Sequence, residues 1–368
     1  MLKQTILQKT LTKKHFQDFL TLLRFKSISS DIKTINKTIK WVADQFKQIA
    51  DIHFFESNKK KSILVVKKGA NISSLNIILN GHIDVVNAPD KLFEPIIKDN
   101  KIYARGAYDM KAGVFAGMLA MKQYLQNKQT KQNVGLQIVP DEEVGGFDGT
   151  LYQLKQGVRS KFVISLEPTN FNIALSAKGV CWLQVTAFGK SAHAAYPWNG
   201  KNALLILNKF INNLEKQFKN PTKEEWTTTF NLSNITTENN AMNQIPNQAT
   251  LKIDIRYIPK QKEQLEKFIK EQEKLLNPKI KILMCEPAFD TPKSNIYVKK
   301  LANILKQQAI SYKFEKRNGS SDVRHFARYN IDGIEFGPAG GGMHAKDEYV
   351  TIDSIGKLAN ILNRFINS

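Results

Sequence analysis

The sequence predicts an α/β fold, with a larger domain built on a central mixed sheet and a smaller βαββαβ (ferredoxin-like) domain inserted into it. The apolar runs Ile77–Leu79, Val134–Val139 and Phe162–Leu166 have the length and the flanking residues of buried strands. Met110–Leu125, between the first two runs, carries apolar residues at helical spacing. The segments that follow residue 177 have a different order, which predicts the inserted domain.

The start of the chain predicts two helices. Apolar residues recur at helical spacing in Lys14–Thr21 and in Lys37–Ile49. Ser30 or Asp31, which lie between them, can cap the second helix. Further elements of this part are expected as a strand at Ile63–Lys67 and a helix at Gly149–Gln156.

The pattern changes near Ala177. From there we expect strand, helix, strand, strand, helix and strand, in the order Val180–Phe188, Lys201–Phe218, Trp226–Thr237, Ala249–Ile258, Lys260–Leu276 and Lys279–Glu286. This is the split βαβ arrangement, and its length is normal for a domain. The α/β pattern resumes at Asn295–Gln308 and continues through Gly333–Phe336 to Ser354–Phe365. The predicted domains are therefore 1–176 with 288–368, and 177–287.

Composition excludes several classes of protein. The chain has 368 residues, enough for two domains, and its apolar runs are too short to cross a bilayer. Its first residues lack a continuous apolar segment, so no signal peptide is expected. Cys181 and Cys285 fit a reduced cytoplasmic chain without a disulfide framework. We therefore expect a cytoplasmic protein with no membrane partner.

The formal net charge of +21 raises the question of nucleic-acid binding. Only eight of the 54 basic residues are arginine, the residue on which bidentate readers of phosphates and bases depend. Lys, Ile and Asn are abundant together, as A+T-rich codons would produce. We expect no nucleic-acid partner, although a basic field could steer an anionic substrate.

The apolar runs end at residues that can bind metals. His82 and Asp84 follow Ile77–Leu79, and residues two apart on a strand face the same way, so Asp84 can orient the imidazole. The alternative for this pair is a turn with an acid nearby by chance. Asp109 follows Tyr103–Arg105, a further strand-like run, and its alternative interpretation is a helix N-cap.

More acids follow two further strands. Asp141, Glu142 and Glu143 come after Val134–Val139, and Glu167 comes after Phe162–Leu166. A run of acids is usually a solvated loop, which is a poorer explanation directly after a buried strand. His344 follows three glycines, where the backbone can approach a ligand closely.

Together these residues predict a metal site. Two histidines and several carboxylates without cysteine suit Zn²⁺, Mn²⁺ or Co²⁺ at a hydrolytic site. Two ions sharing one carboxylate would hold a hydroxide between them, and a neighbouring carboxylate that is not a ligand would act as general base.

Six segments of the chain resemble the M20 metallopeptidase family, in the family's order: GHIDVV, ARGAYDMKAG, PDEEVGG, SLEPT, GKSAHAAYP and GMHAKDEYV. The resemblance covers essentially the whole chain. It implies a catalytic α/β domain, split in sequence, and an inserted lid domain that often forms dimers. One departure is Asn87, which stands where many members have Pro.

The resemblance also implies a role for each matching residue. Asp109 would bridge two metals, Zn²⁺ being the expected ion, and the peptide bond to Met110 would be cis. The other ligands would be His82 with Glu167 at one metal, and Glu143 with His344 at the other. Glu142 would be the general base, and Asp84 would orient His82.

In the lid, His193 resembles a residue that stabilises the oxyanion, often across a homodimer. Asn243 and Arg256 resemble residues that hold the substrate carboxylate. Two alternatives remain open: His193 as a surface histidine, and Arg256 as the partner of an acid on the lid sheet. Ser320–Phe326 resembles a segment of the desuccinylase branch, in which Arg324 would meet a substrate carboxylate.

The expected function is hydrolysis of the amide bond of an N-acyl amino acid, by a succinyl-diaminopimelate desuccinylase or an acetylornithine deacetylase-like enzyme. The alternative within the family is a carboxypeptidase or dipeptidase that releases a C-terminal amino acid. An alternative of another class is a non-catalytic binding relative, which predicts the loss of a ligand or of the base. The five expected metal ligands and the expected base, Glu142, are all present in the sequence.

Overall fold

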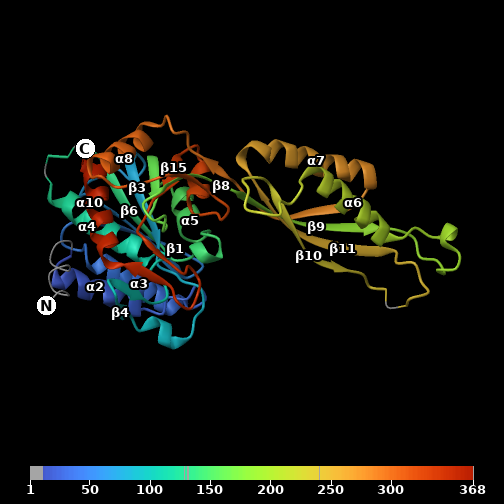
Figure 1. Ribbon diagram of the computed structural model, residues 1–368, viewed down its shortest axis with the longest axis horizontal. Coiled ribbons are helices and arrows are strands. Elements are labelled where there is room, and N and C mark those ends of the chain that lie inside the picture. Colours follow the sequence, from blue (N-terminus) through green and yellow to red (C-terminus); the bar gives the residue numbers. More distant parts are fainter. Residues whose placement is uncertain (1–10, 128, 131, 240, 368) are drawn as a thin grey trace. The chain divides into compact units, whose positions relative to one another are not determined.

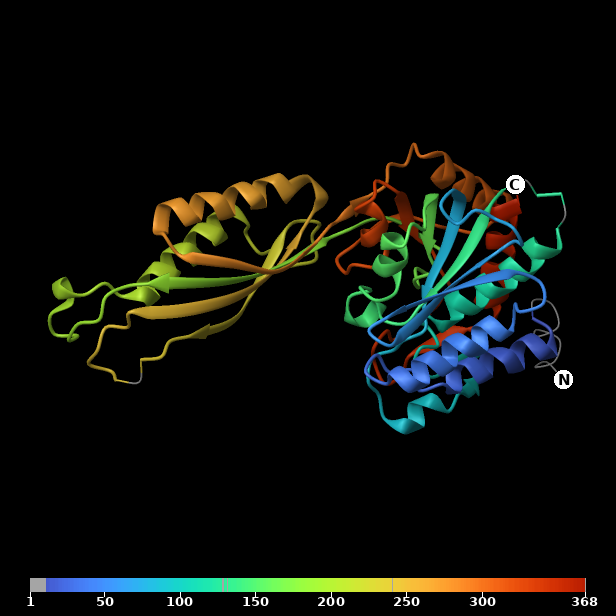
Figure 2. The same cartoon turned by 180° about the vertical axis from the view of Figure 1, so that it is seen from behind.

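The computed structural model describes residues 11–127, 129–130, 132–239 and 241–367 (Figures 1 and 2). The chain divides into two compact units. The first unit takes the chain through Ser176 and adds Thr291–Glu315 and Ser321 onward, and the second consists of Ala177–Asp290 and Lys316–Ser320. The second unit thus extends past the expected end at residue 287 and includes a short later segment that the sequence did not indicate.

A central mixed sheet organises the first unit, as predicted. Its strands are ordered β1 (Asp51–Ser57), β2 (Lys60–Val66), β6 (Val134–Val139), β3 (Leu75–His82), β7 (Ser160–Ser165), β15 (Asp332–Glu335) and β8 (Ile173–Ala177). Neighbouring strands from β6 to β15 are parallel, and the pairs β1–β2, β2–β6 and β15–β8 are antiparallel. Two short strands, β13 (Phe289–Asp290) and β14 (Phe314–Arg317), lie where the chain passes between units.

Helices cover both faces of this sheet because its central strands are apolar on both faces. Ile77, Leu79 and Leu136 share a core with α2 (Lys13–Arg24), α3 (Ile32–Asp44), α4 (Lys111–Gln126), α8 (Ile296–Gln307) and α10 (Ile352–Asn367). Figure 1 shows α4 and α10 side by side. Ile78 and Val163 alternate with that set and face the opposite side, which α5 (Thr150–Lys155) and α9 (Val323–Ala327) cover.

The caps and ends of the helices follow local sequence. Asp31 is the N-cap of α3, and its side chain accepts a hydrogen bond from the Thr34 N–H at 3.1 Å. This confirms one of the two expected caps. The helix begins and ends five residues before the predicted Lys37–Ile49, and it buries Ile35 in a first turn that the prediction left out.

A second, small sheet in the first unit was not predicted. Its order is β16 (Gly340–Gly341), β17 (Tyr349–Thr351), β5 (Lys101–Tyr103) and β4 (Ile96–Lys98), all antiparallel. The strand-like run expected at Tyr103–Arg105 begins earlier, since β5 spans Lys101–Tyr103 and belongs to this smaller sheet. Strands of two or three residues are too short to show a periodicity.

The second unit has the predicted β-α-β-β-α-β order. Its elements are β9 (Gly179–Phe188), α6 (Ala203–Gln217), β10 (Thr229–Thr236), β11 (Gln248–Tyr257), α7 (Lys262–Leu276) and β12 (Lys279–Glu286), with strand order β10-β11-β9-β12. The two helices cover one face of the antiparallel sheet (Figure 2). Phe210 of α6 and Phe268 of α7 meet edge-on, with ring centroids 5.6 Å apart, above Leu183 and Ile253 in a core separate from that of the first unit. Among the described residues, no helix has both the length and the apolar character that crossing a bilayer requires.

Candidate metal centre

Three parallel neighbouring strands of the central sheet end at the same edge. His82 is the last residue of β3, and β6 and β7 flank that strand. Glu142 and Glu143 form a single 3-10 turn shortly after β6, and Glu167 follows β7. Because the carboxyl ends of parallel strands meet at one edge, these four side chains come together there.

The small sheet delivers two more side chains to the same place. Asp109 follows β5, and its peptide bond to Met110 is cis, as the resemblance implied. The residue that precedes α4 is Met110, and no side chain caps that helix, so the interpretation of Asp109 as an N-cap is wrong. His344 lies between β16 and β17 with a φ of 62°, in the left-handed region.

The carboxylate of Asp109 stands between the two histidines. Its Oδ1 lies 3.3 Å from His82 Nε2, and its Oδ2 lies 3.0 Å from His344 Nε2. A further carboxylate accompanies each histidine: Glu167 Oε1 is 3.8 Å from His82 Nε2, and Glu143 Oε1 is 3.2 Å from His344 Nε2. Two groups of potential ligands can be drawn in this cluster, His82–Asp109–Glu143 and His82–Glu142–Glu167.

The cluster concentrates charge in a buried place. Burial opposes a charged His82, but the close carboxylates of Asp109 and Asp84 outweigh it and hold the pKa of His82 well above its usual value. Hydrogen bonds to Asp109 and Glu143 raise the pKa of His344 to about 10. Burial, followed by the charge of Asp109, raises the pKa of Glu167.

This donor set fits divalent cations. Within the described residues, His82 Nε2, Asp109 Oδ1 and Glu167 Oε1 are buried without a hydrogen-bond partner, and they face one another. Buried polar atoms left unpaired are rare and call for an explanation. Imidazole nitrogens and carboxylate oxygens are the ligands of zinc and related ions at hydrolytic sites. Convergent unpaired donors of these types therefore form a suitable metal site.

Glu142 has different surroundings from the acids beside it. Its Oε1 lies 3.6 Å from Nη1 of Arg324, and its side chain is 13% exposed. Burial raises the pKa of Glu142 to about 8, although His82 and Arg324 act in the opposite direction. A carboxylate at the edge of a metal cluster is placed to exchange protons with a bound water.

A family model matches most of the chain. Residues 78–368 match the model described as Peptidase family M20/M25/M40. The chain belongs to the M20 peptidase family. Members of this family are hydrolases that depend on two metal ions, and this M20 chain is a metal-dependent hydrolase.

Similar proteins of known function and structure agree with that membership. Among curated relatives are succinyl-diaminopimelate desuccinylases of Pelagibacter ubique (31% identical, covering 80% of this chain and 82% of the relative) and of Nautilia profundicola (28% identical, covering 95% and 97%). Similar solved structures include the aminopeptidase PepT of Bacillus cereus (TM-score 0.75, 17% identity, covering 97% and 98%). Another is an M20 family metallo-carboxypeptidase of Sulfolobus solfataricus (TM-score 0.73, 18% identity, covering 97% and 99%). At these identities the solved structures support the fold alone.

Asp84 holds the M20 cluster together through more contacts than the sequence indicated. Strand β3 ends at His82, so Asp84 lies beyond the strand and not on it. His82 Nδ1 contacts the Asp84 carbonyl oxygen at 2.9 Å and the Asp84 carboxylate oxygen Oδ1 at 3.3 Å. The same carboxylate accepts hydrogen bonds from the backbone N–H groups of Glu142 (3.1 Å) and Glu143 (3.2 Å), and from the Ser29 hydroxyl (2.8 Å).

A buried ion pair between Arg105 and Glu348 was missed. Arg105 Nη1 lies 2.5 Å from Glu348 Oε2, and its Nη2 donates to the carbonyl oxygen of His344 at 2.9 Å. Glu348 Oε1 accepts from the backbone N–H groups of Tyr108 (2.9 Å) and Asp109 (3.0 Å). The pair thus fixes the backbone of two members of the metal cluster. Both residues lie inside motifs quoted for the family, which was the available signal.

The candidate substrate-binding residues are divided between the two units. His193 and Asn243 lie together in the second unit, where the Ala194 N–H donates to the Asn243 carbonyl oxygen at 2.8 Å. Arg256 makes a bidentate contact with Asp254, with Nε–Oδ1 at 2.9 Å and Nη2–Oδ2 at 3.0 Å, which is the alternative left open for it. Arg324, in the first unit, donates to the Gly145 carbonyl oxygen at 2.8 Å in addition to its contact with Glu142.

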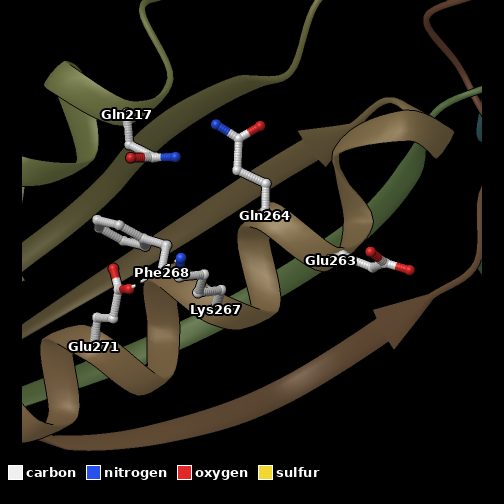
Figure 3. Close-up of a pocket in the computed structure, with 6 residues that line it drawn as sticks. All are labelled: Gln217, Glu263, Gln264, Lys267, Phe268 and Glu271. Carbon is white, nitrogen blue, oxygen red and sulfur yellow. Dashed lines mark ion pairs between the residues drawn. The ribbon is translucent and has the colours of Figure 1, made fainter.

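A surface pocket in the second unit has a different character. Figure 3 shows its lining by α7 and the end of α6: Gln217, Glu263, Gln264, Lys267, Phe268 and Glu271. Lys267 and Glu271 neutralise each other across one helical turn, at 3.8 Å. This lining offers no counterpart to the convergent imidazole and carboxylate groups of the metal cluster.

Proposed function

We propose that the chain hydrolyses the amide bond of an N-acyl amino acid, and that N-succinyl-diaminopimelate is the first substrate to test. The observation that supports a two-metal hydrolase most directly is the position of Asp109, whose two carboxylate oxygens each face a different histidine. The choice of acyl group rests on the curated relatives, several of which are succinyl-diaminopimelate desuccinylases of 27% to 31% identity.

Five residues would hold the two metal ions. In this proposal Asp109 bridges them, His82 and Glu167 complete one site, and Glu143 and His344 complete the other. Zn²⁺ suits these ligands best, and Co²⁺ or Mn²⁺ suits them too. Bound metals supply polarisation of the scissile carbonyl and a lowered pKa of the attacking water.

The chain's own groups perform the proton transfers. Glu142 takes the proton of the attacking water and later gives it to the leaving amine, as general base and then general acid. Asp84 keeps His82 in orientation and holds the backbone of Glu142 by a hydrogen bond. His193 stabilises the oxyanion, and substrate carboxylates are bound by Asn243, Arg256 and Arg324. Arg256 would have to exchange its contact with Asp254 for one with the substrate.

The two units take different roles in this proposal. The first unit is the catalytic domain, and the second unit is a lid through which a homodimer assembles. His193 then acts either within its own chain or across that dimer. We place the protein in the cytoplasm, because its two cysteines are free and its relatives are bacterial desuccinylases.

A second candidate is a carboxypeptidase or dipeptidase that releases a C-terminal amino acid. The observation that favours it is the similarity of the fold to peptidases, among them the Sulfolobus metallo-carboxypeptidase. Both reactions use the same metals and base, so they differ in the acyl group that the enzyme accepts.

A substrate panel separates the two candidates. The purified chain is loaded with Zn²⁺, Co²⁺ or Mn²⁺ and given N-succinyl and N-acetyl amino acids and a set of dipeptides. We expect release of succinate from N-succinyl-diaminopimelate to have the highest kcat/KM. A higher kcat/KM for dipeptides would replace the first candidate with the second. Absence of turnover on every substrate, with two metals bound, would contradict both and favour a binding protein.

A further inference from the structure

The two cysteines of the chain face each other in the second unit. Cys181 lies on β9 and Cys285 on β12, and the antiparallel register places them directly opposite one another. Opposed residues of an antiparallel pair have Cα atoms roughly 4.5–5.5 Å apart, within the roughly 4.4–6.8 Å that a disulfide spans. A β-bulge between Ile282 and Met284 precedes Cys285 and sets this register.

The two thiols have unequal surroundings. Cys181 belongs to the core of the second unit and is 1% exposed, whereas Cys285 is exposed to solvent. The interaction with the Cys181 thiol lowers the pKa of Cys285, as does the charge of Lys262, against the opposite effect of burial. The interaction with Cys285 and burial raise the pKa of Cys181. Cys285 is therefore the thiol that solvent reaches and that reacts first.

We propose that Cys181 and Cys285 form a reversible oxidation site for hydrogen peroxide and related peroxides. In the first step the Cys285 thiolate attacks one peroxide oxygen, the O–O bond breaks, and sulfenic acid and hydroxide form. In the second step the Cys181 sulfur displaces the hydroxyl of that sulfenic acid. The S–S bond forms and one water leaves, which carries the Cys181 proton. A dithiol reductant restores both thiols.

The position of the pair gives the oxidation a structural consequence. Cys181 lies just after the chain enters the second unit at Ala177, and Cys285 lies shortly before it leaves at Asp290. A disulfide would join β9 to β12 at the entry and exit ends and close nearly the whole unit into a covalent loop. Opening of these strand ends would become rarer, and amide hydrogen exchange reports such opening.

The test uses the full chain, reduced and then exposed to hydrogen peroxide. We expect the intact mass to fall by two hydrogens, both alkylatable thiols to disappear together, and a peptide linking Cys181 to Cys285 to appear in a non-reducing digest. Backbone amides of β9 and β12 near the pair should exchange more slowly after oxidation, and a dithiol should reverse every change. Retention of both thiols under peroxide that fully oxidises free glutathione would overturn the proposal, as would a disulfide between two chains.

Three variants distinguish this chemistry from general thiol oxidation. Cys181→Ser should stop at the sulfenic acid of Cys285, trapped as a dimedone adduct. Cys285→Ser should keep the buried Cys181 thiol unoxidised. The matched control, Cys285→Ser with Met284→Cys, moves the second thiol one residue along β12 to the opposite face of the sheet, where it should not pair with Cys181. An intramolecular disulfide in this control would show that register does not decide the pairing, and would overturn the proposal.

Discussion

Asp109 shows how one side chain can organise a site made of distant segments. Its two oxygens contact His82 on one side and His344 on the other, at 3.3 Å and 3.0 Å. Neither histidine contact depends on sequence proximity, since β3, the β5–α4 loop and the β16–β17 loop each contribute one residue. Burial raises the pKa of this carboxylate, but its close contacts with His344 and His82 outweigh burial and lower the pKa, so the group keeps its ionised form.

The first prediction concerns Glu142. Glu142→Gln keeps the shape of the side chain and removes its capacity to accept a proton. We expect kcat to fall by ~10²–10⁴-fold, the usual contribution of general acid–base catalysis. Metal content, measured by mass spectrometry of the purified chain, should remain at the wild-type level, because the five proposed ligands are intact. Activity close to wild type would remove Glu142 from the role of base.

The second prediction concerns stability and pH at His325. This side chain is fully buried, and its Nε2 contacts the Gly145 carbonyl oxygen at 2.9 Å. Burial, aided by the charge of Arg324, lowers the pKa of His325 to about 3. Between about pH 3 and the ordinary histidine value of about 6.5, the unfolded chain binds a proton that the folded chain does not. The contribution of His325 is therefore fully present above pH 6.5 and is lost as pH falls, by up to about 1.4 kcal/mol per pH unit.

The variant His325→Gln tests whether His325 makes the free energy of unfolding depend on pH. The amide can still donate to the Gly145 carbonyl oxygen but does not titrate in this range. Plotted against pH between 4 and 6, the free energy of unfolding from urea titrations should have a shallower slope in the variant than in the wild type. Parallel slopes would show that His325 does not remain neutral in the folded chain. At pH 7.5, above the ordinary pKa of histidine, the difference in free energy of unfolding between wild type and variant measures the substitution without the effect of protonation.

At the scale of elements, the small sheet and its buried ion pair position two of the six side chains of the cluster, Asp109 and His344. Glu348 precedes β17 and Arg105 follows β5, and together they contact the backbone of Asp109 and His344. We expect Glu348→Gln to weaken metal binding and to destabilise the fold by ~3–5 kcal/mol, because Arg105 would remain buried without its counter-charge. Metal titration of activity should need more metal for half-saturation, with kcat recovering toward wild type at saturation.

A surface ion pair supplies the control for that prediction. Lys40 and Asp44 are 3.2 Å apart on α3, and both side chains are more than half exposed. Asp44→Asn should change the free energy of unfolding by less than ~1 kcal/mol and leave the metal titration unchanged. If Glu348→Gln lowers kcat at saturating metal but does not shift the metal titration, the Arg105–Glu348 pair does not act through the metal ligands.

Much of the secondary structure was predictable because long elements carry their own periodicity. Val134–Val139 has the same bounds in the sequence and the structure, and the order of elements in the second unit was also predicted. The small sheet was not, since strands as short as β16 have no pattern to read. Strand β1, with the sequence DIHFFES, was missed as well, because charged and polar residues interrupt its apolar positions.

The site was predictable to the extent that it depends on strand ends. His82, Glu143 and Glu167 follow strands that the sequence indicated, so their convergence followed from parallel pairing. Glu348 had no such signal, since its partner Arg105 lies in a distant segment and neither residue resembles a catalytic group. The contact between Arg256 and Asp254 was accessible in principle, because residues two apart on a strand share a face.

At the scale of the whole molecule, the described residues form two hydrophobic cores and one cluster of candidate metal ligands. The residues proposed as metal ligands all belong to the first unit, and the second unit has its own buried set. Removal of metal by a chelator should therefore destabilise the first unit alone. Ions at 100 times their dissociation constant contribute ~2.7 kcal/mol per site to the folded state.

Calorimetry of the full chain tests this prediction. We expect the chelated protein to show a transition at lower temperature for the first unit, while the second unit unfolds at an unchanged temperature. Hydrogen exchange assigns each transition to its residues. An equal shift of both transitions would show that the two units unfold as one cooperative body.

The two units are completed at different points of translation, because the last segment of the second unit precedes that of the first in the sequence. The second unit is complete once Ser320 has been synthesised, whereas the first unit still lacks α9, β15, β17 and α10 at that moment. His344, a proposed metal ligand, and Glu348, which accepts from the Asp109 N–H, are both synthesised after Ser320. A nascent chain would therefore hold the complete second unit before it holds all five proposed ligands. We therefore expect polypeptides that end before Glu348 to lack hydrolytic activity.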